Sequence, residues 1–149
     1  MGMFDMMSIS ASALSAERQR AEVTSANLAN AETTHTDAGG PYVRKEVVFS
    51  ASNTSAFQTV FNRMGNFGHG PAGTVQLSQV VNDQSAPVMR YEPGNPDANK
   101  DGYVAYPNIN PVTEMVDLMD ATRAYQLNAS AVGAAKQMIQ ESIDILKSS

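Results

Sequence analysis

The chain has 149 residues, a formal net charge of -5 at neutral pH and no cysteine. This length suits a single domain, and the lack of cysteine excludes disulfide scaffolds, thiol nucleophiles and cysteine-based metal or iron–sulfur sites. The ten lysine and arginine residues are scattered and form no basic stripe, so nucleic acid is not an expected partner.

The start of the chain does not have the pattern of a secretory signal peptide. Asp5 precedes the first basic residue, Arg18, whereas a signal peptide carries positive charge ahead of its apolar run. No stretch approaches the roughly 18 apolar residues that a membrane-spanning helix needs. We therefore expect a chain that does not span a membrane and that, if it is exported, uses another route.

Residues 3–33 predict one long helix, because the stretch is rich in Ala, Ser, Met and Leu and contains neither Gly nor Pro. Residues 111–147 predict a second long helix, with Gly133 as its only weak point. The start of this second helix is well marked. Asn110 can cap the free N–H groups, and Pro111 suits the first helical position because its missing donor matters least there.

The middle of the chain has a different composition, since it holds every proline except Pro111 and nearly all the glycines. Residues 43–49 and 74–81 carry β-branched and apolar side chains between turn signals, which predicts two to four short strands. Residues 51–73 are typical of a polar loop. We therefore expect three segments: an N-terminal helix in 1–33, a middle in 34–110 and a C-terminal helix in 111–149.

Both predicted helices carry residues at seven-residue spacing, which is typical of helices packed at shallow angles. The N-terminal repeat is Met7, Leu14, Ala21 and Leu28, and the C-terminal repeat is Leu118, Tyr125, Val132, Ile139 and Leu146. The expected fold class is therefore mainly α, with two long helices packed as a coiled-coil-like pair and a small irregular or β middle segment.

Each helix also carries a second apolar stripe. These stripes are Ile9, Ala16 and Val23 in the first helix and Ala124, Ala131, Met138 and Ile145 in the second. A pair of helices buries one stripe on each partner, so a second stripe is left over on each. We expect other chains to cover it.

One motif in the middle has the spacing of metal ligands. Asp97, Asn99 and Asp101 match the first half of a calcium loop, and Gly102 stands at the position of the sharp turn. The second half does not match, because the twelfth position is Asn108 rather than Glu and prolines interrupt the entering helix. We therefore expect a polar turn in which Asp and Asn side chains bond their own backbone.

The remaining motifs do not predict chemistry. Residues 68–73 spell G-x-G-x-x-G but precede a predicted strand, whereas a dinucleotide-binding loop leads into a helix. His35 and His69 lie in predicted loops without the spacing of paired metal ligands. We expect no catalysis, no cofactor and no metal site.

Several segments resemble one known family. Residues 25–34, SANLANAETT, resemble the signature that ends the N-terminal helix of bacterial flagellar basal-body rod proteins. The chain is similar to the proximal-rod branch of that family at residues 39–42, 47–49, 91–99 (YEPGNPDAN), 102–110 (GYVAYPNIN), 114–116 and 123–126.

The resemblance implies a structural subunit of the hollow proximal rod, which transmits torque and encloses the export channel. It implies export through the flagellar type III apparatus and assembly in the periplasm. The implied partners are other copies of the chain, other proximal and distal rod proteins and the rod-to-ring adaptor. The implied assembly interface comprises the two seven-residue repeats together with Asn27 and Asn30, whose side chains we expect to bond backbone at the turn into the middle.

Two alternatives stay open at this point. One is another flagellar rod subunit, of the FlgB type, against which the resemblance of residues 97–110 argues. The other is a calcium-binding interaction module that uses Asp97, Asn99 and Asp101.

Overall fold

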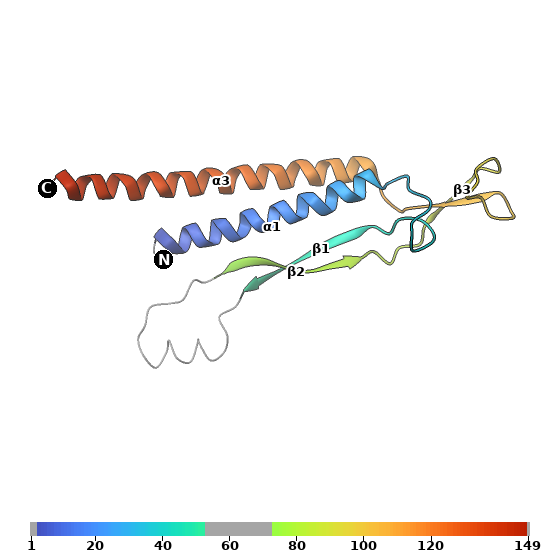
Figure 1. Cartoon of the computed structure of the whole chain (residues 1–149), viewed down its shortest axis with the longest axis horizontal. Coiled ribbons are helices and arrows are strands. Elements are labelled where there is room, and N and C mark those ends of the chain that lie inside the picture. Colours follow the sequence, from blue (N-terminus) through green and yellow to red (C-terminus); the bar gives the residue numbers. More distant parts are fainter. Residues whose placement is uncertain (1–2, 53–72, 149) are drawn as a thin grey trace, which may run out of the picture. The chain divides into compact units, whose positions relative to one another are not determined.

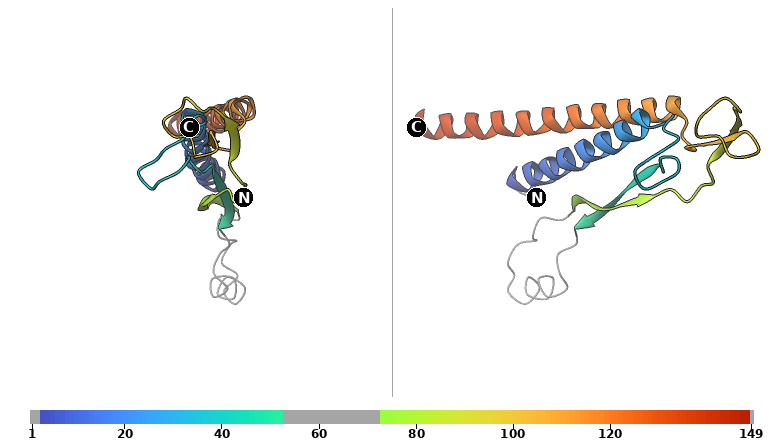
Figure 2. Two further views of the ribbon diagram at one scale, coloured as in Figure 1. Left: turned by 90° about the vertical axis from the view of Figure 1, so that its right-hand side faces the viewer. Right: turned by 45° about the vertical axis from the view of Figure 1, so that its right-hand side comes forward.

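A computed structural model gives the fold and describes residues 3–52 and 73–148 (Figure 1). The elements in chain order are α1 (Met3–Ala29), β1 (Lys45–Ser52), β2 (Thr74–Asn82), β3 (Val88–Tyr91), β4 (Tyr103–Tyr106) and α3 (Pro111–Ser148). The predicted loop at 51–73, its G-x-G-x-x-G segment and His69 lie almost entirely outside the described residues. The two helices pack together and the strands belong to a small middle, so the predicted fold class is confirmed (Figure 2).

The chain divides into two compact units, and each contains part of both helices. The first combines Met1–Gln19, Phe49–Ser78 and Ala121–Ser149, and the second combines Arg20–Val48 and Gln79–Asp120. The middle segment contributes strand residues to both units.

The start of α3 is the one that the sequence predicts. The side-chain oxygen of Asn110 accepts a hydrogen bond from the N–H of Val112 at 3.0 Å, and its carbonyl accepts the first helical bond, from the N–H of Glu114, at 3.1 Å. Pro111 occupies the first helical position, where no donor is needed. This cap fixes the residue at which α3 begins.

The end of α1 differs from the prediction, because the helix stops at Ala29 rather than near residue 33. The N–H of Ala31 bonds the carbonyl of Leu28 at 3.3 Å, which tightens the last turn. The carbonyl of Thr33 instead accepts the N–H of Tyr42 at 3.0 Å. The chain turns back early because Asn and Thr are weak helix formers and because this returning segment offers a donor.

The four strands form two separate sheets of two strands each within the described residues. β1 pairs with β2, and β3 pairs antiparallel with β4 in the register Val88 to Tyr106 and Tyr91 to Tyr103. In the first unit the hydroxyl of Ser12 in α1 accepts the N–H of Val75 in β2 at 3.2 Å. The number of strands agrees with the two to four that the sequence predicts.

The buried apolar residues of the helices are small. Ala16 in α1 and Ala121 and Ala135 in α3 are buried, and Ala121 is fully inaccessible. Of the predicted C-terminal repeat, Leu118, Val132 and Ile139 are half-buried, and Tyr125 and Leu146 are exposed. The four N-terminal repeat residues Met7, Leu14, Ala21 and Leu28 are all half-buried. The predicted repeats therefore lie beside the most buried positions, because closely approaching helices need small side chains between them.

Gly102 is required by the turn between β3 and β4. Its φ of +80° is in the left-handed region, and a Cβ added there would lie 2.9 Å from Cε2 of Tyr91 and 3.3 Å from Cβ of Pro93. The rings of Tyr91 and Tyr103 pack edge to face beside it, with centroids 5.3 Å apart. Only a residue without a side chain fits the backbone and the aromatic pair together.

We expect Gly102→Ala to lower the free energy of unfolding by about 1–2 kcal/mol or more, because it adds both left-handed strain and a clash. Gly94→Ala is the control, since an added Cβ there meets no atom within 4 Å and the φ is not left-handed. Urea unfolding of the two variants checks this. Equal stability of both would contradict the role given to Gly102.

Candidate assembly site

A buried polar side chain, Asn27, lies at the centre of the second unit. Its amide nitrogen donates to the carbonyl of Lys45 at 2.8 Å and to Oε2 of Glu114 at 3.3 Å. Its amide oxygen accepts the N–H of Lys45 at 2.9 Å and the hydroxyl of Tyr42 at 3.1 Å. All four hydrogen-bonding positions of the amide are used, although Asn27 is only 2% exposed.

Asn27 pairs with Lys45 as a neighbouring strand would. It bonds both the N–H and the carbonyl of that one residue, which is the first residue of β1. An amide side chain has the donor and acceptor of a peptide group, so it can satisfy the backbone where the sheet offers no partner. The end of α1 thereby fixes where β1 begins.

Glu114 carries a carboxylate that is buried in the first turn of α3, with 2% of the residue exposed. Nε of Arg44 donates to Oε1 of Glu114 at 2.7 Å, and the same guanidinium also pairs with Glu46. A buried carboxylate is tolerated only with such partners, and its place in the first turn is favourable for the helix dipole. Removing one partner would leave a charge in the interior.

Both asparagine side chains bond backbone groups, as the sequence predicts, but Asn27 does so at the start of β1 and not at the turn that follows α1. Asn30 bonds the carbonyl of Ala26 within α1 at 2.8 Å, close to the helix end as expected. Asn27 instead reaches Lys45, 18 residues along the chain. Because Asn27 is engaged inside the chain, its contribution to assembly would be through the fold. The meeting of Tyr42, Arg44 and Glu114 was not predicted from the sequence, because nothing in their spacing shows that they lie together.

The segment that resembles a calcium loop is a polar turn. The side-chain oxygen of Asn99 accepts the N–H groups of Asp101 and Tyr103, both at 2.9 Å. Asp97 accepts the hydroxyl of Thr34 at 2.6 Å. Among residues 3–52 and 73–148, no three acidic, histidine or cysteine side chains are grouped to hold a metal ion. The prediction of Asp and Asn side chains bonding local backbone is confirmed at Asn99.

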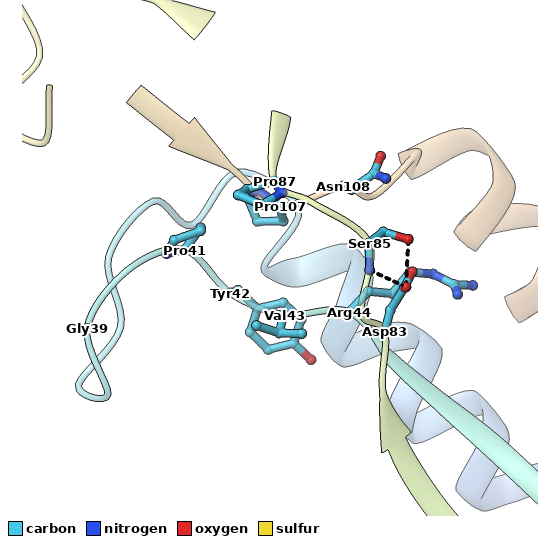
Figure 3. Close-up of a pocket in the computed structure, with 10 residues that line it drawn as sticks. All are labelled: Gly39, Pro41, Tyr42, Val43, Arg44, Asp83, Ser85, Pro87, Pro107 and Asn108. Atoms are coloured by element: carbon cyan, nitrogen blue, oxygen red, sulfur yellow. Dashed lines mark hydrogen bonds between the residues drawn. The ribbon is translucent and has the colours of Figure 1, made fainter. Parts of the chain in front are cut away.

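The second unit also contains an open cavity of about 280 Å³ beside Tyr42 and Arg44 (Figure 3). Three prolines line it: Pro41, Pro87 and Pro107. The carboxylate of Asp83 accepts both the N–H of Ser85, at 2.8 Å, and its hydroxyl, at 2.7 Å. These bonds from Ser85 lower the pKa of Asp83 and keep its carboxylate ionised.

The described part of α3 leaves many large apolar side chains in contact with solvent. Tyr125 and Leu146 of the predicted repeat are 43% and 79% exposed. The first two turns add four residues outside the predicted repeat: Val112, Met115, Val116 and Met119, each 48% to 68% exposed. Their spacing of three and four residues places them on one face of the helix. No described helix is long and apolar enough to cross a membrane.

Two family models match the chain, and both describe flagellar rod proteins. Residues 7–34 match the model "Flagella basal body rod protein", and residues 100–145 match "Flagellar basal body rod FlgEFG protein C-terminal". The matched parts comprise most of α1 and α3 together with β4. The fold is thus that of a structural protein of the flagellar basal body.

Characterised relatives narrow this class. The flagellar basal-body rod protein FlgC of Bacillus subtilis is 39% identical over 97% of this chain and 98% of its own length. The FlgC proteins of Borreliella burgdorferi and Salmonella typhimurium are 32% and 34% identical over 99% and 97% of this chain, and over 99% and 98% of their own lengths. The chain belongs to the FlgC family of flagellar basal-body rod proteins, and it is a structural subunit of the rod.

We expect Asn27→Ala to lower the free energy of unfolding by about 2–4 kcal/mol, because it leaves both backbone groups of Lys45 and the Tyr42 hydroxyl without their partner. Asn30→Ala, a change of the same residue type in the same turn, is the control and should cost less than about 1 kcal/mol. Urea unfolding measures both, and hydrogen exchange at the Lys45 amide reports the local effect. Unchanged protection of that amide in Asn27→Ala would contradict the assignment.

The pKa of Tyr42 is raised above its ordinary value of about 10, first by burial and then by the negative charge of Glu114. The unfolded chain therefore loses this proton at a lower pH than the folded chain does. Stability due to Tyr42 is complete below pH 10 and is lost as the pH rises from there through the folded pKa. We expect Tyr42→Phe to unfold with a shallower loss of stability above pH 10. An identical slope in both proteins would show that Tyr42 does not titrate this way.

Proposed function

We propose that the chain polymerises through the exposed apolar side chains of its terminal helices. The observation that carries this proposal is the exposure of large apolar residues along α3, including Tyr125 and Leu146 of the predicted repeat. Apolar surface gains roughly 25 cal/mol for each Å² removed from water, so such a helix is stabilised when neighbours cover it. The repeat residues Met7, Leu14, Ala21, Leu28, Leu118, Val132 and Ile139 would flank these contacts.

The partners that we propose are copies of the same chain, other proximal and distal rod proteins and the rod-to-ring adaptor. We also propose export through the flagellar type III apparatus and assembly in the periplasm. Membership of the FlgC family and the resemblance of residues 25–34 and 91–110 to proximal-rod proteins support this.

The proposed mechanism is mechanical. Side chains that interdigitate at a close-packed interface resist sliding, because movement would open voids and expose apolar surface. Many such contacts around a hollow shaft share the load, so the shaft transmits torque. Within each subunit, the ion pair between the half-buried Arg44, which directly precedes β1, and the buried Glu114 holds the start of this strand to the start of α3.

Tyr125→Asp tests the proposed interface. Tyr125 is 43% exposed in the chain, so we expect this substitution to change the stability of the monomer by less than about 1 kcal/mol. Burying the new carboxylate between subunits costs several kcal/mol, so subunits should fold but fail to incorporate. Electron microscopy of basal bodies and swimming assays measure the outcome, with monomer stability followed by urea unfolding.

Gln137→Asp is the matched control, because it places the same charge on an exposed position of the same helix outside the predicted repeat. Cells with Gln137→Asp should swim. Normal rods and swimming with Tyr125→Asp would remove this residue from the interface.

A further inference from the structure

The strand β3 has a hydrogen-bonding edge without a partner. The N–H of Glu92, directly after β3, donates to the carbonyl of Gly102 at 2.8 Å, so the backbone groups of every second residue before Glu92 face β4. The N–H and carbonyl groups of Met89 and Tyr91 therefore point away from β4. Within residues 3–52 and 73–148, none of these outward groups takes part in a hydrogen bond.

The edges of β1 and β4 are protected, in contrast to that of β3. The side chain of Asn27 bonds both backbone groups of Lys45 at the start of β1. In β4, the N–H of Tyr103 donates to the side-chain oxygen of Asn99 at 2.9 Å, and its carbonyl accepts the N–H of Asn99 at 2.8 Å. A strand edge without such partners is a template for pairing with another chain, and β3 presents one.

The two faces of β3 differ in chemistry. Met89 and Tyr91 are 50% and 65% exposed and share the apolar face. Arg90 lies on the opposite face, where its guanidinium stacks over the ring of Tyr106 at 4.4 Å. No carboxylate among the described residues forms an ion pair with Arg90, and that of Glu92 accepts the Tyr106 hydroxyl at 2.9 Å instead. One face thus suits apolar side chains, and the other offers a positive charge.

We propose that β3 is a strand-addition site for an extended segment of another protein. The added strand bonds the outward backbone groups of Met89 and Tyr91 and places apolar side chains beside them. Its intervening residue is Asp or Glu and lies opposite Arg90, because opposite charges that face each other across two strands stabilise the pair. The site lies in the middle segment and is separate from the surfaces of the terminal helices.

A second copy of the chain does not offer such a segment. An acidic residue has Val, Leu, Ile, Met or Phe on both sides at residues 4–6, 116–118 and 143–145. These segments all lie in α1 or α3. The backbone groups of a helix are bonded within it, so they are not available to a strand. The occupant is therefore a different protein, recognised by an acidic residue between apolar ones in an extended segment.

Photo-crosslinking in living cells tests this inference. A photoreactive amino acid replaces Val88, which is 43% exposed and whose backbone groups face β4, so the outward edge stays intact. Mass spectrometry should identify a crosslinked segment of another protein with an acidic residue between apolar ones. Arg90→Glu should lower the crosslinking yield about tenfold or more, and changing the acidic residue of that segment to Lys should restore it.

Met89→Pro tests the strand geometry, because it removes an outward N–H and no bond to β4. Met89→Thr is the matched control, since it keeps the N–H and suits a strand. The crosslink should be lost in Met89→Pro and kept in Met89→Thr. Hydrogen exchange at the Arg90 amide, which faces β4, shows in the purified chains whether β3 still pairs with β4. If Met89→Pro disrupts this pairing, the charge reversal at Arg90 decides the question.

A crosslink that persists in Met89→Pro while the Arg90 amide stays protected would overturn strand addition. So would the absence of any crosslink, a crosslink to a helical segment or to a second copy of the chain, or a yield that Arg90→Glu does not change. Each of these outcomes leaves the proposed polymerisation through α1 and α3 intact, because β3 belongs to neither helix.

Discussion

The side-chain amide of Asn27 joins segments that lie 18 and 87 residues away from it in the sequence. It satisfies the backbone of Lys45 where β1 begins and bonds Glu114 where α3 begins. Because losing this amide would leave the backbone of Lys45 and the buried carboxylate of Glu114 with fewer partners, the end of α1, the start of β1 and the start of α3 stabilise one another. The positions of the strand and of both helices in the second unit depend on this single residue.

The helices were predictable because their signals are local. Residues 3–33 lack breakers, and Asn110 with Pro111 marks a helix start in two adjacent residues. The end of α1 was not predictable to the residue, since it depends on the N–H of Tyr42, which arrives from beyond the turn. The same limit applies to the polar cluster. Arg44 and Glu114 are separated by 70 residues, and no spacing in the sequence brings them together.

The seven-residue repeats show a different limit of sequence reasoning. Large apolar residues make the repeats visible in the sequence, yet the buried apolar positions of the helices are alanines such as Ala121. In a chain that folds alone, large side chains fill the core. Here the small residues allow the chain's own helices to approach closely, and many of the large ones remain outside. This distribution fits a subunit whose interior is completed by its neighbours.

The cap at Asn110 also sets the angular phase of everything that follows it. Each residue of an α-helix turns the next by about 100° and advances it by about 1.5 Å. A helix with a frayed start could shift this phase, but one that begins at a fixed residue presents each later side chain at a fixed azimuth. One residue inserted after the cap would rotate Tyr125 and Leu146 by more than a quarter of a turn. The residue at which α3 begins therefore fixes which side chains of the helix face a neighbouring subunit in the proposed assembly.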